Sequence, residues 1–166
     1  RDGRSAGTKS YMWVYRSGHL YTDKQIVLYD YHKTRNSSHP REFLRNYSGI
    51  CVTDGYQVYH TIEKEREDLQ IAGCWVHARR KFDEALNKSN AFLVIKQIQA
   101  IYREEGKLNK LSSEERLMQR QLVIKPLVDA LFAYLKKMEP TVPASGQLRK
   151  AYTYILNQEK YLRVFL

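Results

Sequence analysis

The chain has 166 residues, enough for one domain with a hydrophobic core or for a small domain that carries a helical attachment. A hydrophobic content of 43% and 13 tyrosines indicate a folded protein and exclude a disordered one. Lysine and arginine number 28 against 18 acidic residues, a net charge of +10, so a polyanion is the first partner to consider. The alternative is a basic protein with no such partner.

Two features of the sequence bear on where the protein works. The two cysteines, Cys51 and Cys74, lie in apolar contexts and do not form a spaced framework, which argues against a disulfide-stapled secreted fold. We find no targeting peptide and no apolar run of about 18 residues, so we expect a cytoplasmic protein without membrane contact. The sequence begins without Met and ends in an amphipathic pattern, "YLRVFL", so we expect a piece of a longer polypeptide.

The first third of the chain alternates strands and helices. Aromatic and β-branched residues at 11–16 and 25–32 predict an antiparallel hairpin. "HPREFLRNY" predicts a short helix with Pro40 in its first turn and a stripe of Phe43, Leu44 and Tyr47. The nearly all-apolar "GICVT", residues 49–53, predicts a strand that is buried on both faces.

The alternation continues with a helix and a strand. Apolar positions between Tyr56 and about Glu67 fit a helix, and "LQIAGC", residues 69–74, fits a short strand. Together with the hairpin, these elements predict an α/β sheet with mixed strand directions over residues 1–75. Residues 76–166 are predicted to be helical, so the fold class is an α/β core followed by an all-helical region.

The helical part carries its own boundary signals. A stripe of Trp75, Ala78, Phe82, Ala85 and Leu86 predicts the first helix, and a second is expected over residues 92–103. Ser112 and Glu115 have the spacing of a capping box at the start of the next helix.

Three prolines mark further boundaries in this region. Pro126 lies inside an apolar helical pattern and predicts a kink or two abutting helices. The segment around residues 139–146, "EPTVPASG", is predicted to be a linker, and one last helix is expected from Gln147 to the end of the chain.

Asp54 is the first candidate for chemistry. It follows the predicted buried strand 49–53, and Gly55 lets the chain turn directly into a helix. Reacting groups and ligands collect at the carboxyl ends of strands in α/β sheets, so Asp54 has a position suited to catalysis. The alternative is a helix N-cap, in which the carboxylate accepts hydrogen bonds from the first free N–H groups of the helix. Local sequence leaves both interpretations open.

Cys74 and His77 form a C-x-x-H pair. A structural zinc ion needs four ligands, and the remaining cysteine and histidines are scattered along the chain, which argues against zinc. A nucleophilic Cys/His pair is also weakly supported, because three residues on one helix entry do not orient a base against a thiolate. The plainer interpretation is a buried small Cys beside a partly exposed His.

Basic and aromatic residues alternate in two places. "HARRKF" contains Arg79, Arg80 and Lys81 in succession, and "RKAYTYILNQEKYLR" alternates cations with tyrosines. Such surfaces suit nucleic acids, because cations neutralise phosphates and aromatic rings stack on exposed bases. The alternative for each run is a solvated helix face. Asp30 shares a strand face with His32 and is a further candidate for a place near a site. The alternative for Asp30 is a side chain that simply faces water.

At "YMWVYRSG", "HPREFLRNYSGICVTDGYQVY" and "CWVHARRKF" the sequence resembles the transposases of the insertion sequence sixty-six family. The resemblance continues through "SSEERLMQRQLVIKPLVDALFAYL" to "ILNQEKYLRVFL" and so covers nearly the whole chain. Its most specific part is the pair of blocks "TDGY..Y" and "CW.HARR.F" at this separation. The resemblance implies a ribonuclease H-like fold in which three carboxylates, two Asp and one Glu, hold two Mg²⁺ or Mn²⁺ ions.

The same resemblance assigns roles to individual residues. Asp54 corresponds to the second catalytic aspartate, and Cys74 and His77 correspond to a block that supports either the site or the fold. In the family the first aspartate precedes the position of Arg1, and the glutamate is expected beyond Leu166. The chain therefore looks like the central part of a transposase, with one of the three catalytic carboxylates.

Several expectations follow from the resemblance. The parent protein would cut and join double-stranded DNA during transposition in the bacterial cytoplasm, whereas one aspartate cannot organise two metal ions about 4 Å apart, so the chain alone would not cut DNA. A central strand missing from the sheet would leave exposed strand edges, which predicts pairing with another chain in a homo-oligomer. The alternative function is a non-enzymatic, basic nucleic-acid-binding or assembly module on the same scaffold.

Overall fold

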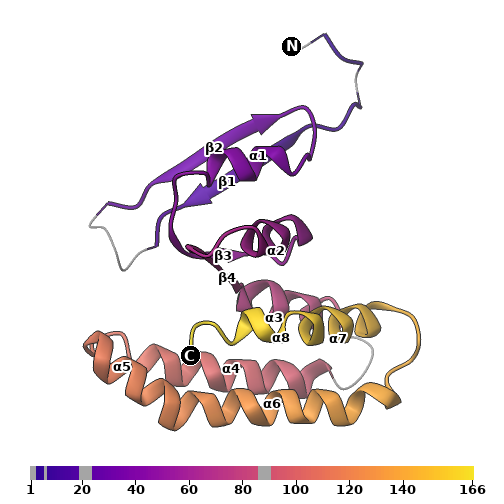
Figure 1. Cartoon of the computed structure of the whole chain (residues 1–166). Coiled ribbons are helices and arrows are strands. Elements are labelled where there is room, and N and C mark those ends of the chain that lie inside the picture. Colours follow the sequence, from indigo (N-terminus) through magenta and orange to yellow (C-terminus); the bar gives the residue numbers. More distant parts are fainter. Residues whose placement is uncertain (1–2, 6, 19–23, 86–90) are drawn as a thin grey trace. The chain divides into compact units, whose positions relative to one another are not determined.

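The computed structural model describes residues 3–5, 7–18, 24–85 and 91–166 (Figure 1). The chain is a mixed α/β protein that is mostly helical, as expected in outline from its sequence. It divides into two compact units, residues 1–49 and 50–166. The sequence predicted an α/β region up to residue 75 and helices after it, and the described elements after residue 75 are helices. The division between the two compact units falls earlier, within the third strand.

The first unit is a hairpin with one short helix. Strand β1 (Tyr11–Arg16) pairs with β2 (Val27–His32) in an antiparallel register that places Trp13 opposite Asp30, which confirms the predicted hairpin. Helix α1 (Ser38–Phe43) follows and ends earlier than the predicted stripe. The Phe43 ring stacks on Tyr15 with 3.5 Å between ring centroids, so α1 covers one face of the hairpin.

The second unit begins with a strand–helix–strand segment. Strand β3 (Gly49–Thr53) leads through α2 (Gln57–Lys64) to β4 (Leu69–Gly73), which is hydrogen-bonded to β3. The Cys74 amide donates to the Thr53 carbonyl at 3.0 Å, so both strands end at the same edge of the sheet.

Two predictions about the strands differ from the structure. The described strands form two separate two-stranded sheets, β1–β2 and β3–β4, where the sequence predicted one mixed sheet. Strand β3 was predicted to be buried on both faces, which is wrong, because Ile50 and Val52 are 53% and 64% exposed. The exposed Ile50 and Val52 alternate with the more buried Cys51 and Thr53, so one face of β3 is covered and the other is exposed.

Helices make up the rest of the second unit, and the predicted capping box is present. These elements are α3 (Trp75–Asp83), α4 (Ala91–Lys107), α5 (Ser113–Gln119), the π-helix η2 (Arg120–Ile124) and α6 (Lys125–Met138). The Ser112 side chain accepts from the Glu115 amide at 3.2 Å, and the Ser112 amide donates to the Glu115 carboxylate at 2.9 Å. The predicted discontinuity near Pro126 is confirmed by the junction of α5, η2 and α6, whereas Leu86 lies outside the described residues.

The chain ends in two helices where the sequence predicted one. After the short 3₁₀ turn η3 (Glu139–Thr141), α7 (Gln147–Asn157) is followed by α8 (Glu159–Leu162). The break falls at Gln158, whose ψ of 1° departs from helical geometry and whose side chain is buried. None of the described helices is long and apolar enough to cross a membrane.

The hydrophobic core lies among α3, α4, α6 and α7, which lie alongside one another in Figure 1. Its largest fully buried side chains come from all of these helices and from η2 and α8: Phe82, Val94, Ile98, Ile124, Leu131, Phe132, Leu135, Tyr152, Ile155 and Leu162. The rings of Phe82 and Tyr152 meet edge to face with 5.6 Å between centroids, joining α3 to α7.

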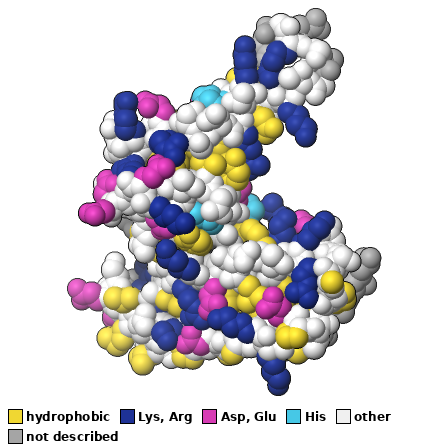
Figure 2. All heavy atoms as spheres, turned by 45° about the vertical axis from the view of Figure 1, so that its right-hand side comes forward, with side chains coloured by type: hydrophobic (Ala, Val, Ile, Leu, Met, Phe, Trp, Pro, Cys, Tyr) yellow, Lys and Arg dark blue, Asp and Glu magenta, His cyan; other side chains and the backbone are white. Residues whose placement is uncertain are grey.

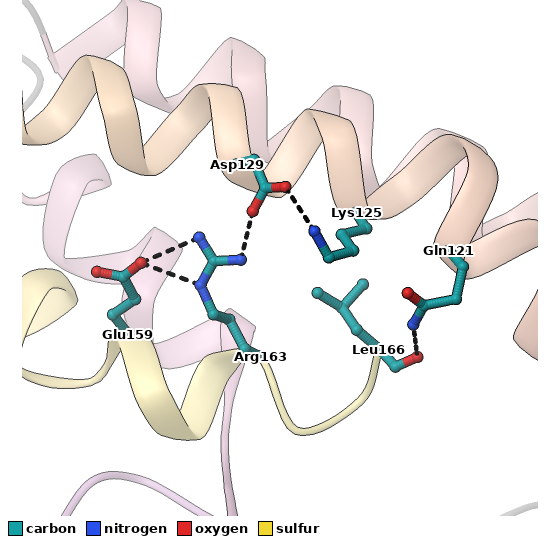
Figure 3. Close-up of polar contacts among 6 residues, drawn as sticks. All are labelled: Gln121, Lys125, Asp129, Glu159, Arg163 and Leu166. Atoms are coloured by element: carbon teal, nitrogen blue, oxygen red, sulfur yellow. Dashed lines mark hydrogen bonds and ion pairs between the residues drawn. The ribbon is translucent and has the colours of Figure 1, made fainter.

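Charged residues fasten the end of the chain to α6 (Figure 3). Arg163 pairs with Asp129 of α6 at 2.6 Å and with Glu159 of α8 at 3.0 Å, while Lys125 reaches the other Asp129 oxygen at 3.0 Å. The Gln121 side chain donates to the Leu166 carbonyl at 2.7 Å. These half-exposed pairs form a network, which orients α8 better than an isolated surface pair would.

Candidate functional site

Asp54 lies at the edge where β3 and β4 both end, and its side chain is exposed. One carboxylate oxygen, Oδ1, accepts a hydrogen bond from the Tyr56 amide at 3.0 Å, which is an Asx turn between two residues of the same loop. The N-cap of α2 is Tyr56, and Asp54 makes no bond to an amide inside the helix. The helix-cap alternative for Asp54 is therefore wrong, and the carboxylate is left facing outward from the turn.

The main chain of this turn is held from the far end of the sequence. The Tyr154 hydroxyl of α7 donates to the Asp54 carbonyl at 2.8 Å, across 100 residues of sequence. Gly55 has a φ of +83°, and a Cβ at this position would lie 3.0 Å from the Tyr154 hydroxyl oxygen and 3.0 Å from Cδ of Gln158. The turn therefore requires glycine both for its backbone conformation and for the close approach of α7.

Cys74 and His77 lie next to the same edge. The Cys74 amide joins the two strand ends, and its half-buried thiol is free. His77 is half-buried, and its Nδ1 atom has no hydrogen-bond partner within the described part of the chain. The pKa of Tyr102 is raised to about 12, mainly by burial and to a smaller extent by the nearby Cys74. The pKa of Tyr154 is also raised to about 12, mainly by burial and to a smaller extent by Asp54. Both tyrosines therefore stay protonated near neutral pH.

The residues around Asp54 do not by themselves make a metal site. A pair of Mg²⁺ or Mn²⁺ ions requires several hard oxygen ligands. Residues 3–5, 7–18, 24–85 and 91–166 contain no group of three or more His, Cys, Asp or Glu side chains placed to hold a metal ion. Asp54 supplies one carboxylate, of which one oxygen is already bonded to Tyr56. These residues can thus offer one ligand, and no catalytic step follows from them alone.

The three consecutive cations of α3 point in different directions, because successive helical residues are about 100° apart. Arg79 and Lys81 lie near carboxylates of their own helix turn, with 3.7 Å from Arg79 Nε to Asp83 and 3.9 Å from Lys81 Nζ to Glu84. Arg80 is exposed and has no ion pair in the described part of the chain. Figure 2 shows basic side chains interspersed with acidic ones on the visible face of the molecule. Arg79 and Lys81 thus each have a carboxylate nearby, and the DNA-binding role of Arg79, Arg80 and Lys81 stays a prediction.

The sequence left the tyrosines near the end of the chain open between a nucleic-acid-binding surface and a solvated helix face, and in the structure Tyr152, Tyr154 and Tyr161 make contacts within the protein. Tyr152 is fully buried, and Tyr161 stacks on the buried His60 of α2 with 3.8 Å between ring centroids. Sequence reasoning also missed Tyr154 as a partner of Asp54. The apolar periodicity of α7 marks Tyr152 as a core residue, but nothing local to Tyr154 indicates a bond to a turn 100 residues earlier.

The turn after β3, the βαβ segment and the helical layer define a mixed α/β protein with an acidic residue at a strand end. The family model described as "Transposase IS66 family" matches residues 1–166. The chain therefore belongs to the IS66 family of transposases.

Three curated relatives come from Sinorhizobium fredii (strain NBRC 101917 / NGR234). Uncharacterized protein y4qI is 28% identical over 99% of this chain and 33% of its own length, and uncharacterized protein y4jD is 28% identical over 84% and 29%. Uncharacterized protein y4hP is 27% identical over 87% of this chain and 30% of its own length. The chain thus spans about a third of the length of these relatives. No solved structure matches it.

Proposed function

We propose that this chain is part of the catalytic region of a DDE-type DNA transposase, which moves an insertion sequence by cutting and joining double-stranded DNA in the bacterial cytoplasm. The observation that carries the proposal is the exposed carboxylate of Asp54, held at the common end of β3 and β4 in a chain of the IS66 family. In this proposal Asp54 is one of three carboxylates that bind two Mg²⁺ or Mn²⁺ ions, and the other two belong to parts of the parent protein beyond these 166 residues.

The fold proposed for the complete protein is ribonuclease H-like. In support, the described strands form two small sheets, each with a helix in its connection or against one face. Ile50 and Val52 are 53% and 64% exposed and share one face of β3, so a further segment that packs on this face would bury them. That segment would come from elsewhere in the parent protein or from a second copy, which is the reason for proposing a homo-oligomer as one assembly.

The test is the substitution Asp54→Asn in the complete transposase. This change keeps the size of the side chain and removes its charge, so we expect strand cleavage at transposon ends with Mg²⁺ or Mn²⁺ to fall at least a hundredfold. The matched control is Asp68→Asn, because Asp68 is an exposed carboxylate that pairs with Arg66 at 2.7 Å, away from the Asp54 turn. Wild-type cleavage by Asp54→Asn would overturn the proposal.

A second test assays the 166-residue chain alone. We expect no cleavage of transposon-end DNA at millimolar Mg²⁺ or Mn²⁺, because one carboxylate does not bind a pair of ions. Specific cleavage by this chain that disappears with Asp54→Asn would contradict the expectation that other carboxylates are needed.

The second candidate function is a basic nucleic-acid-binding or assembly module without chemistry. The net charge of +10 and the exposed Arg80 favour it. The Asp54→Asn variant distinguishes the two functions. If the chain only binds nucleic acid or supports assembly, the variant should work in the parent protein as well as the wild type does.

A further inference from the structure

The Asp54 turn is fixed at two different atoms by two different parts of the chain. Its side chain is held within the loop, by the Tyr56 amide at 3.0 Å. Its main-chain carbonyl is held from α7, by the Tyr154 hydroxyl at 2.8 Å. Removing the second bond would leave the local Asx turn in place but would free the turn to move relative to the sheet edge.

The contact between α7 and the turn is close on a second side. The Gln158 side chain packs over Gly55, where a Cβ would lie 3.0 Å from Cδ and 3.1 Å from Oε1 of Gln158. Gln158 is 7% exposed and occupies the break between α7 and α8. The helix break thus lets a buried side chain reach the residue that follows Asp54.

The segment that carries Tyr154 and Gln158 is firmly anchored. On α7, the neighbouring Tyr152 and Ile155 are fully buried in the core. On α8, the Leu162 carbonyl accepts from the Trp75 indole at 2.9 Å, and the Arg163 network ties the end of the chain to α6 (Figure 3). The Tyr154 hydroxyl is therefore presented by a fixed element, which is what a positioning contact requires.

Chemistry also suits Tyr154 to this role. A hydroxyl that points at a carbonyl must act as the donor, and burial together with the nearby Asp54 charge raises the pKa of Tyr154 to about 12. The hydroxyl therefore keeps its proton throughout the pH range in which DNA is handled.

We propose that α7 sets the position of the Asp54 carboxylate, with Tyr154 as a positioning residue and Gln158 as the packing support of the same turn. This inference rests on the proposed role of Asp54 in the transposase. It assigns a task to the C-terminal helices, which otherwise look like a purely structural layer.

The test is Tyr154→Phe, which removes one oxygen atom and keeps the ring. The matched control is Tyr152→Phe, the same chemical change two residues earlier, because the buried Tyr152 hydroxyl has no hydrogen-bond partner in the described part of the chain. In the complete transposase we expect cleavage to fall about tenfold to a hundredfold for Tyr154→Phe, since small misplacements of a reacting group have effects of that order. Tyr152→Phe should cleave as the wild type does.

A second measurement is independent of activity. In a ¹⁵N-correlated spectrum of the 166-residue chain, Tyr154→Phe should shift the amide signals of Gly55 and Tyr56 and leave those of β4 in place. Tyr152→Phe should move neither Gly55 nor Tyr56. Unchanged Gly55 and Tyr56 signals in Tyr154→Phe would overturn the proposal whatever the activity, because they would show that the hydroxyl does not hold the turn.

The two proposals fail in different ways. If Asp54→Asn is inactive while Tyr154→Phe cleaves as the wild type does, the positioning role is refuted and the proposed function stands. If Asp54→Asn is fully active, the proposed catalytic role of Asp54 is refuted, and with it the proposal that Tyr154 positions Asp54 for catalysis.

Discussion

Gly55 is the residue at which two segments 100 residues apart come within contact distance. Its φ of +83° belongs to the left-handed region, which costs other residues about 1–2 kcal/mol. The approach of Tyr154 and Gln158 adds a second requirement, because there is no room for a Cβ without displacing one of them. Backbone conformation and packing thus select glycine at the same position for independent reasons.

The first prediction separates these two reasons. Gly55→Ala should lower the free energy of unfolding by more than Gly7→Ala, measured by urea denaturation of the chain. Gly7 has a similar φ of +92°, but a Cβ there meets no atom within 4 Å, so its substitution tests the cost of the backbone conformation without a steric contact. The difference between the two variants is expected to be at least about 1 kcal/mol. Equal losses would show that the contact with α7 contributes nothing to stability.

Single residues differ in how far the sequence could predict them. The place of Asp54 follows from a strand pattern that ends in Asp-Gly, a signal contained in seven neighbouring residues. The partners of Arg79 and Lys81 were also within reach, because Asp83 and Glu84 have the i+4 and i+3 spacing of helical ion pairs. The role of Tyr154 could not be predicted from the sequence, since its bond to Asp54 depends on how the helices pack.

At the scale of elements, local signals predicted helix starts better than helix interiors. The capping box at Ser112 is written in four consecutive residues and forms as expected. The π-helical turns of η2 and the break at Gln158 have no comparable local signature. They arise where packing of the helical layer overrides the regular repeat, and β3 was likewise misjudged because its exposure depends on which elements pack on its two faces.

Helix α2 carries a pH-dependent contact. His60 is 3% exposed and stacks on Tyr161, and burial lowers its pKa below the ordinary value of 6.5, an effect that Glu63 opposes and Lys160 reinforces. The unfolded chain takes up a proton near pH 6.5, whereas the folded chain does so only at lower pH. The free energy of unfolding should therefore fall as the pH is lowered through about 6.5.

Urea denaturation at pH 7.5, 6.5 and 5.5 measures this prediction. His60→Phe keeps an aromatic ring against Tyr161 and removes the titration, so its stability should vary less over the same range. If His60→Phe shows the same dependence as the wild type, His60 is not its source.

For the whole molecule, we predict how its affinity for duplex DNA depends on salt and on the cations of α3. Affinity for duplex DNA should fall log-linearly with salt, with a slope near −0.9 for each phosphate contacted. Reversing Arg79, Arg80 and Lys81 to Glu should flatten that slope, measured by fluorescence anisotropy between 50 and 200 mM salt. Arg80→Glu alone should account for most of the change, because Arg79 and Lys81 already lie beside Asp83 and Glu84. An unchanged slope in the triple variant would mean that α3 presents only a solvated face.

The bond between Tyr154 and Asp54 also bears on how the chain folds. A two-stranded sheet such as β3–β4 is marginal by itself in water, so its order depends on a helix that is synthesised about 90 residues later. Closing so long a loop is entropically unfavourable until the helical core has formed around Tyr152, so we expect the strands to become ordered late in folding. A nascent chain that lacks α7 would therefore hold Asp54 in a loose segment, and the carboxylate would reach its position only after the second unit has been completed.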